Sequence, residues 1–157
     1  MKLINIKTGA AIAGEINSVS TSERKALKNN PGFTFDWSVE LDQEVYALSD
    51  QENEVLLGLI ALTDHPFELR IHIDLIESRK EQRGRYKTIG NIAACLIAYA
   101  CRAAFKRGYG GYVSLLPKAQ LISYYEQYGF ARVGRLMAIS GKAAESLIYK
   151  YLGDEEI

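Results

Sequence analysis

The stretch ESRKEQRGRYKTIG, residues 77–90, lies between a strand-like run and a helix-like run of the sequence. Beyond Glu77 it contains one acid, Glu81, and five cations: Arg79, Lys80, Arg83, Arg85 and Lys87. The first turn of a helix leaves backbone N–H groups unpaired and carries partial positive charge. Glycine lets a ligand approach the backbone closely, and Gly84 and Gly90 lie in this stretch. The stretch therefore predicts a local site for a phosphate or diphosphate.

The residues on both sides of this corner have regular periodicity. Residues 68–76 alternate between apolar and polar side chains, which predicts a strand. One face would carry Leu69, Ile71, Ile73 and Leu75, and the other Arg70, His72 and Asp74. Residues 89–107 have apolar side chains at helical spacing and precede Gly108, which predicts a helix.

The rest of the chain predicts further elements around this unit. We expect strands over residues 2–7, 33–41, 44–48, 55–62, 112–116, 130–139 and 145–151. We expect short helices over residues 24–28 and 118–128. Consecutive strands joined by short turns favour antiparallel pairing, and the strand–helix–strand unit adds a parallel pair. The predicted class is therefore α+β, with a mixed, mostly antiparallel central sheet flanked by helices.

Composition narrows the classes of function. A chain of 157 residues, 48% hydrophobic and 24% charged, suits one globular domain over residues 1–157. Lys plus Arg and Asp plus Glu are both 19, and this balance disfavours nucleic-acid binding. Cys95 and Cys101 are expected to be buried, reduced thiols. We see no signal peptide or membrane span, so we expect a cytoplasmic protein. His72 and Asp74 could begin a metal site, but no third and fourth ligands are evident, so we expect none.

Two motifs resemble those of a known family, the GNAT N-acetyltransferases, which bind acetyl-CoA. The family's diphosphate loop has the form Gln/Arg-x-x-Gly-x-Gly/Ala between a strand and a helix. Residues 85–90, RYKTIG, follow this form, with Thr88 in place of the first glycine. Residues 124–130, YYEQYGF, match the family's tyrosine followed by Gly-Phe, although Lys118 replaces an asparagine often found upstream. Neither GxxxxGK[ST] nor GxGxxG occurs, so a P-loop or Rossmann site is not predicted.

The resemblance implies a GNAT-like fold with acetyl-CoA as co-substrate. Its pantetheine arm would pair with the strand edge near Ile76, and its diphosphate would lie on the loop before the helix. The residues expected to hold the cofactor are Leu75, Ile76, Glu77, Arg83, Gly84, Arg85, Tyr86, Lys87, Thr88, Ile89, Gly90, Lys118 and Tyr125.

Two residues are candidates for catalysis. Tyr125 is the expected general acid, because an ordinary tyrosine keeps its proton at a pH where a thiol ionises. The alternative is that Tyr125 is only packed in the core. The adjacent Tyr124 is the other candidate for the acid, but on a helix its side chain would point roughly 100° away from that of Tyr125. Glu77 is the expected general base; it could instead be a surface acid that balances Arg79 and Lys80. The amine could also arrive neutral and need no base.

The predicted function is transfer of an acetyl group directly to a primary amine of a small molecule or peptide. The alternative is a non-catalytic acyl-CoA-binding or regulatory domain of the same fold, which the departures at Thr88 and Lys118 favour. Residues 1–67 would build much of the acceptor pocket. An edge strand over residues 145–151 could pair two copies into a homodimer.

Overall fold

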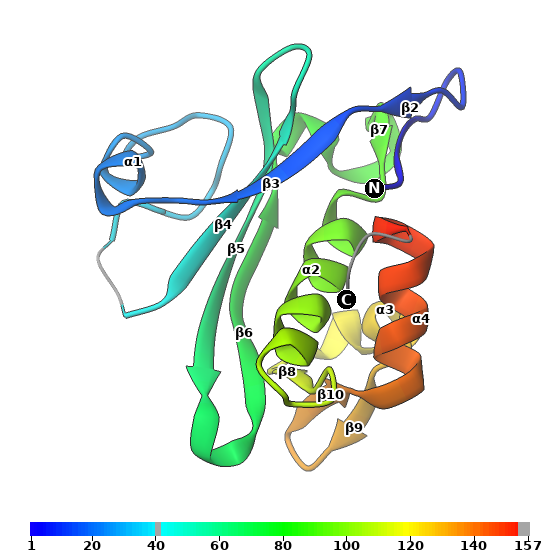
Figure 1. Cartoon of the computed structure of the whole chain (residues 1–157). Helices are drawn as coiled ribbons and strands as arrows, with labels where there is room; N and C mark the ends of the chain where they lie inside the picture. Colours follow the sequence, from blue (N-terminus) through cyan, green and yellow to red (C-terminus); the bar gives the residue numbers. More distant parts are fainter. Residues whose placement is uncertain (40–41, 154–157) are drawn as a thin grey trace.

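The computed structural model describes residues 1–39 and 42–153, which form a seven-stranded sheet, a smaller sheet and helices (Figure 1). The order in the large sheet is β3 (Gly14–Ser18), β4 (Glu44–Asp50), β5 (Val55–His65), β6 (Arg70–Ser78), β8 (Val113–Leu115), β10 (Leu136–Ile139) and β9 (Ala131–Val133). The small sheet contains β2 (Ala11–Ile12), β1 (Leu3–Asn5) and β7 (Ile89–Gly90). The helices are α1 (Thr21–Lys25), α2 (Ile92–Lys106), α3 (Ile122–Glu126) and α4 (Gly141–Leu152). In the described part of the large sheet, β6 and β8 pair in parallel and the other neighbours are antiparallel, which confirms the predicted class.

The helices cover the two faces of the sheet unequally. In Figure 1, α2 and α4 lie on one side of β4, β5 and β6, and α1 lies on the other. The main core lies on the α2 side and includes the buried residues of α2 and α4. A smaller core on the α1 side contains Phe33, Trp37, Val45, Leu59 and Ala61. None of the helices in residues 1–39 and 42–153 has the length and apolarity that crossing a membrane requires.

A β-bulge in β6 changes which face its side chains occupy. Ala61 of β5 pairs with Leu75 and Leu62 pairs with Ile73, so Asp74 lies between them without a partner in the register. The extra residue reverses the alternation. Ile73 lies in the main core, whereas Leu75 packs against the smaller core. The prediction that Leu75 shares a face with Ile73 was therefore wrong, and the bulge places Glu77 on the α1 side.

The segment before β4 is not a strand. Residues 33–39, within the strand predicted over 33–41, form turns and bends; residues 40–41 lie outside the described residues. Backbone N–H groups of Thr34 and Phe35 donate to the Glu77 carboxylate and not to a neighbouring strand. Trp37 is buried in the smaller core, as a strand face would also require, so its apolar character alone did not distinguish the two.

Other differences lie near the C-terminus. The strand predicted over residues 145–151 is wrong, because those residues belong to helix α4. Its buried residues Ala144, Leu147, Ile148 and Tyr151 have helical spacing, which the β-favouring composition of the segment obscured. A hairpin of β9 and β10 replaces the single strand predicted over 130–139. The helix predicted over 118–128 is a 3₁₀ turn, Ala119–Leu121, followed by α3.

Candidate functional site

A cleft of about 730 Å³ opens between the end of β6, the basic loop, the start of α2 and the segment around α3. Its volume lies within the range of small-molecule sites. Seven residues of the predicted site line it: Ile76, Glu77, Arg83, Gly84, Lys87, Ile89 and Tyr125. The structure therefore brings the basic loop and the predicted general acid to one cavity, although they are far apart in the sequence.

The first turn of α2 forms one wall of this cleft. Asn91 precedes the helix with φ 75°, and the N–H of Cys95 donates to the Asn91 carbonyl at 3.0 Å. The N–H groups of Ile92, Ala93 and Ala94 precede the first i→i−4 bond and have no acceptor within the helix. These residues line the cleft with Asn91. These N–H groups carry the partial positive charge of the helix N-terminus, which the sequence predicted at this corner.

The edge of β6 is open where the cleft begins. Its pairing with β8 covers only Ile71–Ile73, and β6 continues to Ser78. The Arg79 N–H bonds to Leu57 on the β5 side. Alternation along a strand then directs the peptide groups of Ile76 and Ser78 toward the opposite side, that of β8. The edge therefore presents backbone groups to the cleft.

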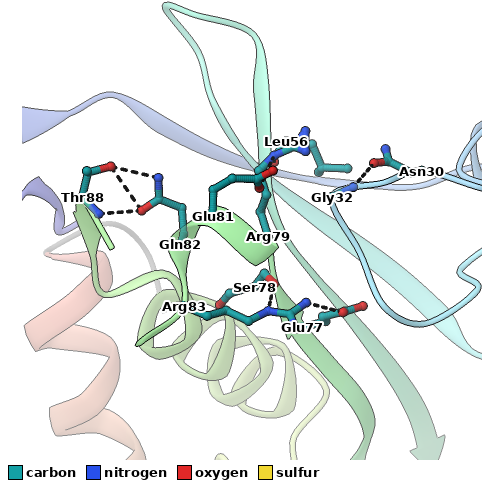
Figure 2. Close-up of polar contacts among 10 residues, drawn as sticks. All are labelled: Asn30, Gly32, Leu56, Glu77, Ser78, Arg79, Glu81, Gln82, Arg83 and Thr88. Carbon is teal, nitrogen blue, oxygen red and sulfur yellow. Dashed lines mark hydrogen bonds and ion pairs between the residues drawn. The ribbon is translucent and has the colours of Figure 1, made fainter. Parts of the chain in front are cut away.

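Gln82 braces the loop that leads into α2. Its Oε1 accepts from the N–H groups of Thr88 and Ile89, both at 2.9 Å, and its Nε2 donates to the Thr88 hydroxyl at 2.9 Å. Figure 2 shows this pairing of Gln82 with Thr88. The Thr88 and Ile89 N–H groups, predicted to hold a diphosphate, are thus already bonded. The N–H groups without an acceptor in the helix are instead those of Ile92–Ala94, after Asn91. The Thr88 hydroxyl accepts the hydrogen bond from Gln82 Nε2.

The Glu77 carboxylate, at the end of β6, accepts hydrogen bonds from four donors. Its carboxylate accepts from the Thr34 N–H at 2.6 Å, the Phe35 N–H at 3.3 Å and Trp37 Nε1 at 2.8 Å. It also forms an ion pair with Arg83, whose guanidinium donates to Ser78 O as well (Figure 2). Glu77 is 5% exposed, so the alternative interpretation, a surface acid that balances Arg79 and Lys80, is wrong.

The bonding of Glu77 decides its protonation. Burial favours the neutral acid and raises its pKa, but hydrogen bonds from Trp37, Thr34, Phe35 and Arg83 outweigh burial. The net result is a lowered pKa for Glu77. A carboxylate with a lowered pKa and four donors is a poor proton acceptor. In this arrangement Glu77 fixes the segment 34–37 beside the cleft, and Phe35 of that segment lines the cleft.

Tyrosines from α3, the turn after it and α4 form another part of the cleft wall. Tyr125 is 8% exposed and lines the cleft with Tyr124, Tyr128 and Tyr151. Burial, and to a smaller extent Tyr124, raises the pKa of Tyr125. The Tyr128 hydroxyl donates to the Tyr124 hydroxyl at 3.2 Å. Tyr125 also packs edge-to-face against Phe130, so the core-packing and cleft-lining interpretations both describe it.

Six predicted cofactor residues lie outside the lining of the cleft: Leu75, Arg85, Tyr86, Thr88, Gly90 and Lys118. Leu75 packs in the smaller core, and the exposed Arg85 stacks on the ring of Tyr86 at 5.5 Å. Gly90 pairs with Ile4 of β1, and a Cβ on Gly90 would lie 3.1 Å from Ile4 Cγ1. Gly90 therefore permits strand packing and not ligand approach.

The sequence did not single out Gln82 or Asn91 as residues of the site. Asn91 had a usable signal, since asparagine is a favoured residue immediately before a helix. Phe35 belongs to residues 1–67, which were expected to build much of the acceptor pocket, and it reaches the cleft through the contact of its segment with Glu77, 42 residues away. His72 and Asp74, earlier on β6, form hydrogen bonds with neighbouring strands. His72 Nδ1 lies 2.8 Å from Ser114 Oγ, and Asp74 accepts from Thr63 at 2.5 Å.

Several solved structures similar to this chain are named as acetyltransferases or acyltransferases. Nourseothricin acetyltransferase aligns with a TM-score of 0.60 and 16% identity, over 82% of this chain and 98% of that one. A chimera of spermidine N-acetyltransferase SpeG from Vibrio cholerae and hSSAT aligns with a TM-score of 0.61 and 15% identity, over 86% and 98%. An acyl-CoA N-acyltransferase from Pseudomonas aeruginosa aligns with a TM-score of 0.55 and 16% identity, over 82% of this chain and 100% of that one.

No protein-family model and no curated protein matches the sequence. The structural likeness nevertheless extends over most of the chain. It establishes an acyltransferase fold. More specifically, the chain has the fold of the GNAT N-acetyltransferases, which the motifs at residues 85–90 and 124–130 predicted.

Proposed function

We propose that the protein is an acetyl-CoA-dependent N-acetyltransferase that transfers the acetyl group directly to a primary amine of a small molecule or peptide. The observation that carries this proposal is the parting of β6 from β8 over a cleft whose wall includes the free N-terminus of α2. This geometry offers a strand edge for an extended amide-bearing arm. It also offers backbone N–H groups for a diphosphate.

The residues of the cleft fit acetyl-CoA, which supplies an activated thioester. The N–H groups of Ile92–Ala94 would hold the diphosphate, with Lys87 adding Coulomb attraction. The Ile76 peptide would pair with the pantetheine arm or polarise the thioester carbonyl; such a donor typically contributes about 3 kcal/mol to transition-state stabilisation. The support from this chain is the position of all three groups on one cleft.

Tyr125 is the proposed general acid. Its raised pKa keeps the hydroxyl protonated, so it can hydrogen-bond the sulfur as the bond to the acetyl carbon breaks. As the amine nitrogen forms the new bond to the acetyl carbon, the carbon–sulfur bond breaks and the hydroxyl proton moves to the departing thiolate. The Tyr125 oxygen then regains a proton from solvent. Glu77 is bonded to four donors, so we assign it to positioning and propose that the amine proton leaves to solvent.

The acceptor is an amine whose identity the similar structures leave open. The similar structures include a nourseothricin acetyltransferase, a spermidine N-acetyltransferase and AtaT complexed with acetyl-methionyl-tRNAfMet. AtaT aligns with a TM-score of 0.55 and 10% identity, over 86% of this chain and 99% of that one. The zero net charge of this chain disfavours a tRNA acceptor and supports a small or weakly charged amine.

Two measurements test the proposal. Acetyl-CoA should raise the melting temperature, because a ligand at 100 times its Kd stabilises the folded state by about 2.7 kcal/mol. A panel of polyamines, aminoglycosides, peptide amines and an aminoacyl-tRNA should then include a substrate that releases free thiol from acetyl-CoA. An unchanged melting curve at millimolar acetyl-CoA would exclude the cofactor site.

The full bonding of Glu77 favours one second candidate, a non-catalytic acyl-CoA-binding domain of the same fold. This candidate predicts the same stabilisation by acetyl-CoA but no thiol release with any member of the panel. Thiol release that is lost on mutation of Tyr125 would exclude it.

A further inference from the structure

Arg83 connects three segments at the mouth of the cleft. Its Nε donates to Ser78 O at 2.7 Å, its Nη1 donates to Thr34 Oγ1 at 3.2 Å, and its Nη2 pairs with Glu77 Oε2. Figure 2 shows the side chain extending from the basic loop to Ser78 and Glu77. The guanidinium therefore lies on the edge of β6 and not free in solvent.

The contact with Ser78 has a consequence for ligand binding. Ser78 is one of the two residues whose peptide groups alternation directs to the open side of β6. An amide-bearing arm that pairs with this edge as far as Ser78 would donate to the Ser78 carbonyl, to which Arg83 Nε already donates. The arm and the guanidinium thus compete for one acceptor.

Release of Arg83 leaves no buried charge without partners. Glu77 keeps its bonds from the Thr34 N–H, the Phe35 N–H and Trp37 Nε1. The Arg83 side chain is 39% exposed, so it can rotate toward the cleft that it also lines. A diphosphate held at the start of α2 would offer the guanidinium a replacement anion.

From this geometry we propose that Arg83 is a specificity-determining residue that closes the β6 edge until a diphosphate draws it away. The cleft then favours thioesters that carry a diphosphate over thioesters of the bare pantetheine arm. A bare arm must break the Arg83 contacts without supplying an anion, whereas acetyl-CoA supplies one. This inference rests on the proposed acetyl-CoA site and adds the residue by which the site discriminates against acyl carriers that lack a diphosphate.

The test compares acetyl-CoA with S-acetylpantetheine, which lacks phosphate, by calorimetric titration of the wild type and Arg83→Met. The variant keeps the length of the side-chain stem but cannot bond Ser78 O. We expect S-acetylpantetheine to bind the variant about tenfold more tightly, because one charged hydrogen bond no longer opposes it. The affinity of the variant for acetyl-CoA should rise less or fall, since the variant also lacks the ion pair that Arg83 would form with the diphosphate.

Two controls complete the test. Lys87→Met removes a cation that lines the same cleft and should weaken acetyl-CoA binding while leaving S-acetylpantetheine unchanged. Arg83→Lys keeps the charge and has a shorter reach; it should bind S-acetylpantetheine with intermediate affinity, and circular dichroism should show that each variant is folded. If Arg83→Met binds acetyl-CoA but gains no affinity for S-acetylpantetheine, the inference is wrong. If the wild type does not bind acetyl-CoA at all, the proposed function fails first, and the inference fails with it.

Discussion

At the scale of single residues, Tyr125 is the clearest target for mutation. Tyr125→Phe should reduce thiol release from acetyl-CoA by about 10²-fold, the lower range for loss of a general acid. Its effect on cofactor affinity should be small, because Phe keeps the packing against Phe130. The raised pKa of Tyr125 also predicts that any alkaline decline in rate due to this group lies above the ordinary tyrosine value of 10.0. A pH–rate profile with an accepted amine measures both effects.

Tyr124 supplies the matched control. It lines the same cleft, but its hydroxyl accepts a hydrogen bond from Tyr128. Tyr124→Phe removes a hydroxyl of the same kind from a neighbouring position and should change the rate by less than about fivefold, which corresponds to about 1 kcal/mol. Equal losses in both variants would argue against a specific general acid at Tyr125.

The buried carboxylate of Glu77 makes the stability of the protein depend on pH in acid. Its folded pKa is lowered from the ordinary value of 4.5, so its stabilising contribution is present above that value and is lost as pH falls through the lowered one. Glu77→Gln should reduce the free energy of unfolding at neutral pH by about 2 kcal/mol, because the amide cannot pair with Arg83 and keeps one acceptor oxygen. Urea denaturation of both proteins at neutral pH and at about pH 3 should show this difference shrinking in acid.

The same variant also tests a base role for Glu77. If Glu77 only positions the segment 34–37, the acidic limb of the pH–rate profile should keep its midpoint in Glu77→Gln. A limb that disappears in the variant would restore Glu77 as the general base. The sequence placed Glu77 correctly at the end of the strand. It could not show the four donors, because three of them come from residues 34–37, about 40 positions away.

At the scale of elements, a single glycine on β5 positions α2. A Cβ on Gly58 would lie 2.8 Å from Ile92 Cγ2 and 3.0 Å from Leu96 Cδ1, both on α2. Gly58→Val should therefore push the first turn of α2 away from the sheet and lower the free energy of unfolding by about 2 kcal/mol, as overpacking does. It should also weaken acetyl-CoA binding, because the free N–H groups of that turn line the cleft. Thermal melts and cofactor titration measure the two effects.

Val55→Thr is a control on the same strand, since Val55 is 36% exposed and the change preserves shape. It should leave the cofactor affinity unaltered. A Gly58→Val protein that is destabilised but binds acetyl-CoA with normal affinity would show that the position of α2 does not determine the cofactor site.

The predicted elements differ in how well local sequence defines them. The unit of β6, basic loop and α2 was predicted because β6 and α2 each have a regular periodicity and the loop between them is rich in cations. Helix α2 begins three residues later than expected. Helix α4 was mistaken for a strand because residues 145–151 are rich in residues that favour strands, while its burial follows helical spacing. That error also removes the edge strand on which a homodimer was predicted. The bulge at Asp74 could not be foreseen, because only pairing with β5 reveals it.

At the scale of the whole molecule, the chain combines zero net charge with a run of five cations over residues 79–87, two of which, Arg83 and Lys87, line the cleft. The charge balance was readable from composition, and so was the expectation of buried thiols. Cys95 and Cys101 both lie in α2 and are 0% exposed. Burial raises the pKa of Cys95 to about 11 and that of Cys101 to about 12. These thiols are therefore unreactive until α2 opens.

This arrangement makes the two thiols reporters of ligand binding to the folded domain. Alkylation should be slow in the native protein and should follow the small fraction in which α2 opens. If α2 opens only with the cleft, a thiol-free cofactor analogue, desulfo-CoA, at 100 times its Kd should slow alkylation about 100-fold. Mass spectrometry of Cys95→Ala and Cys101→Ala, each with one remaining thiol, should give the same slowing at both positions. Alkylation of either thiol at an unchanged rate, in a protein that desulfo-CoA stabilises against heat, would mean that part of α2 opens independently of the cleft.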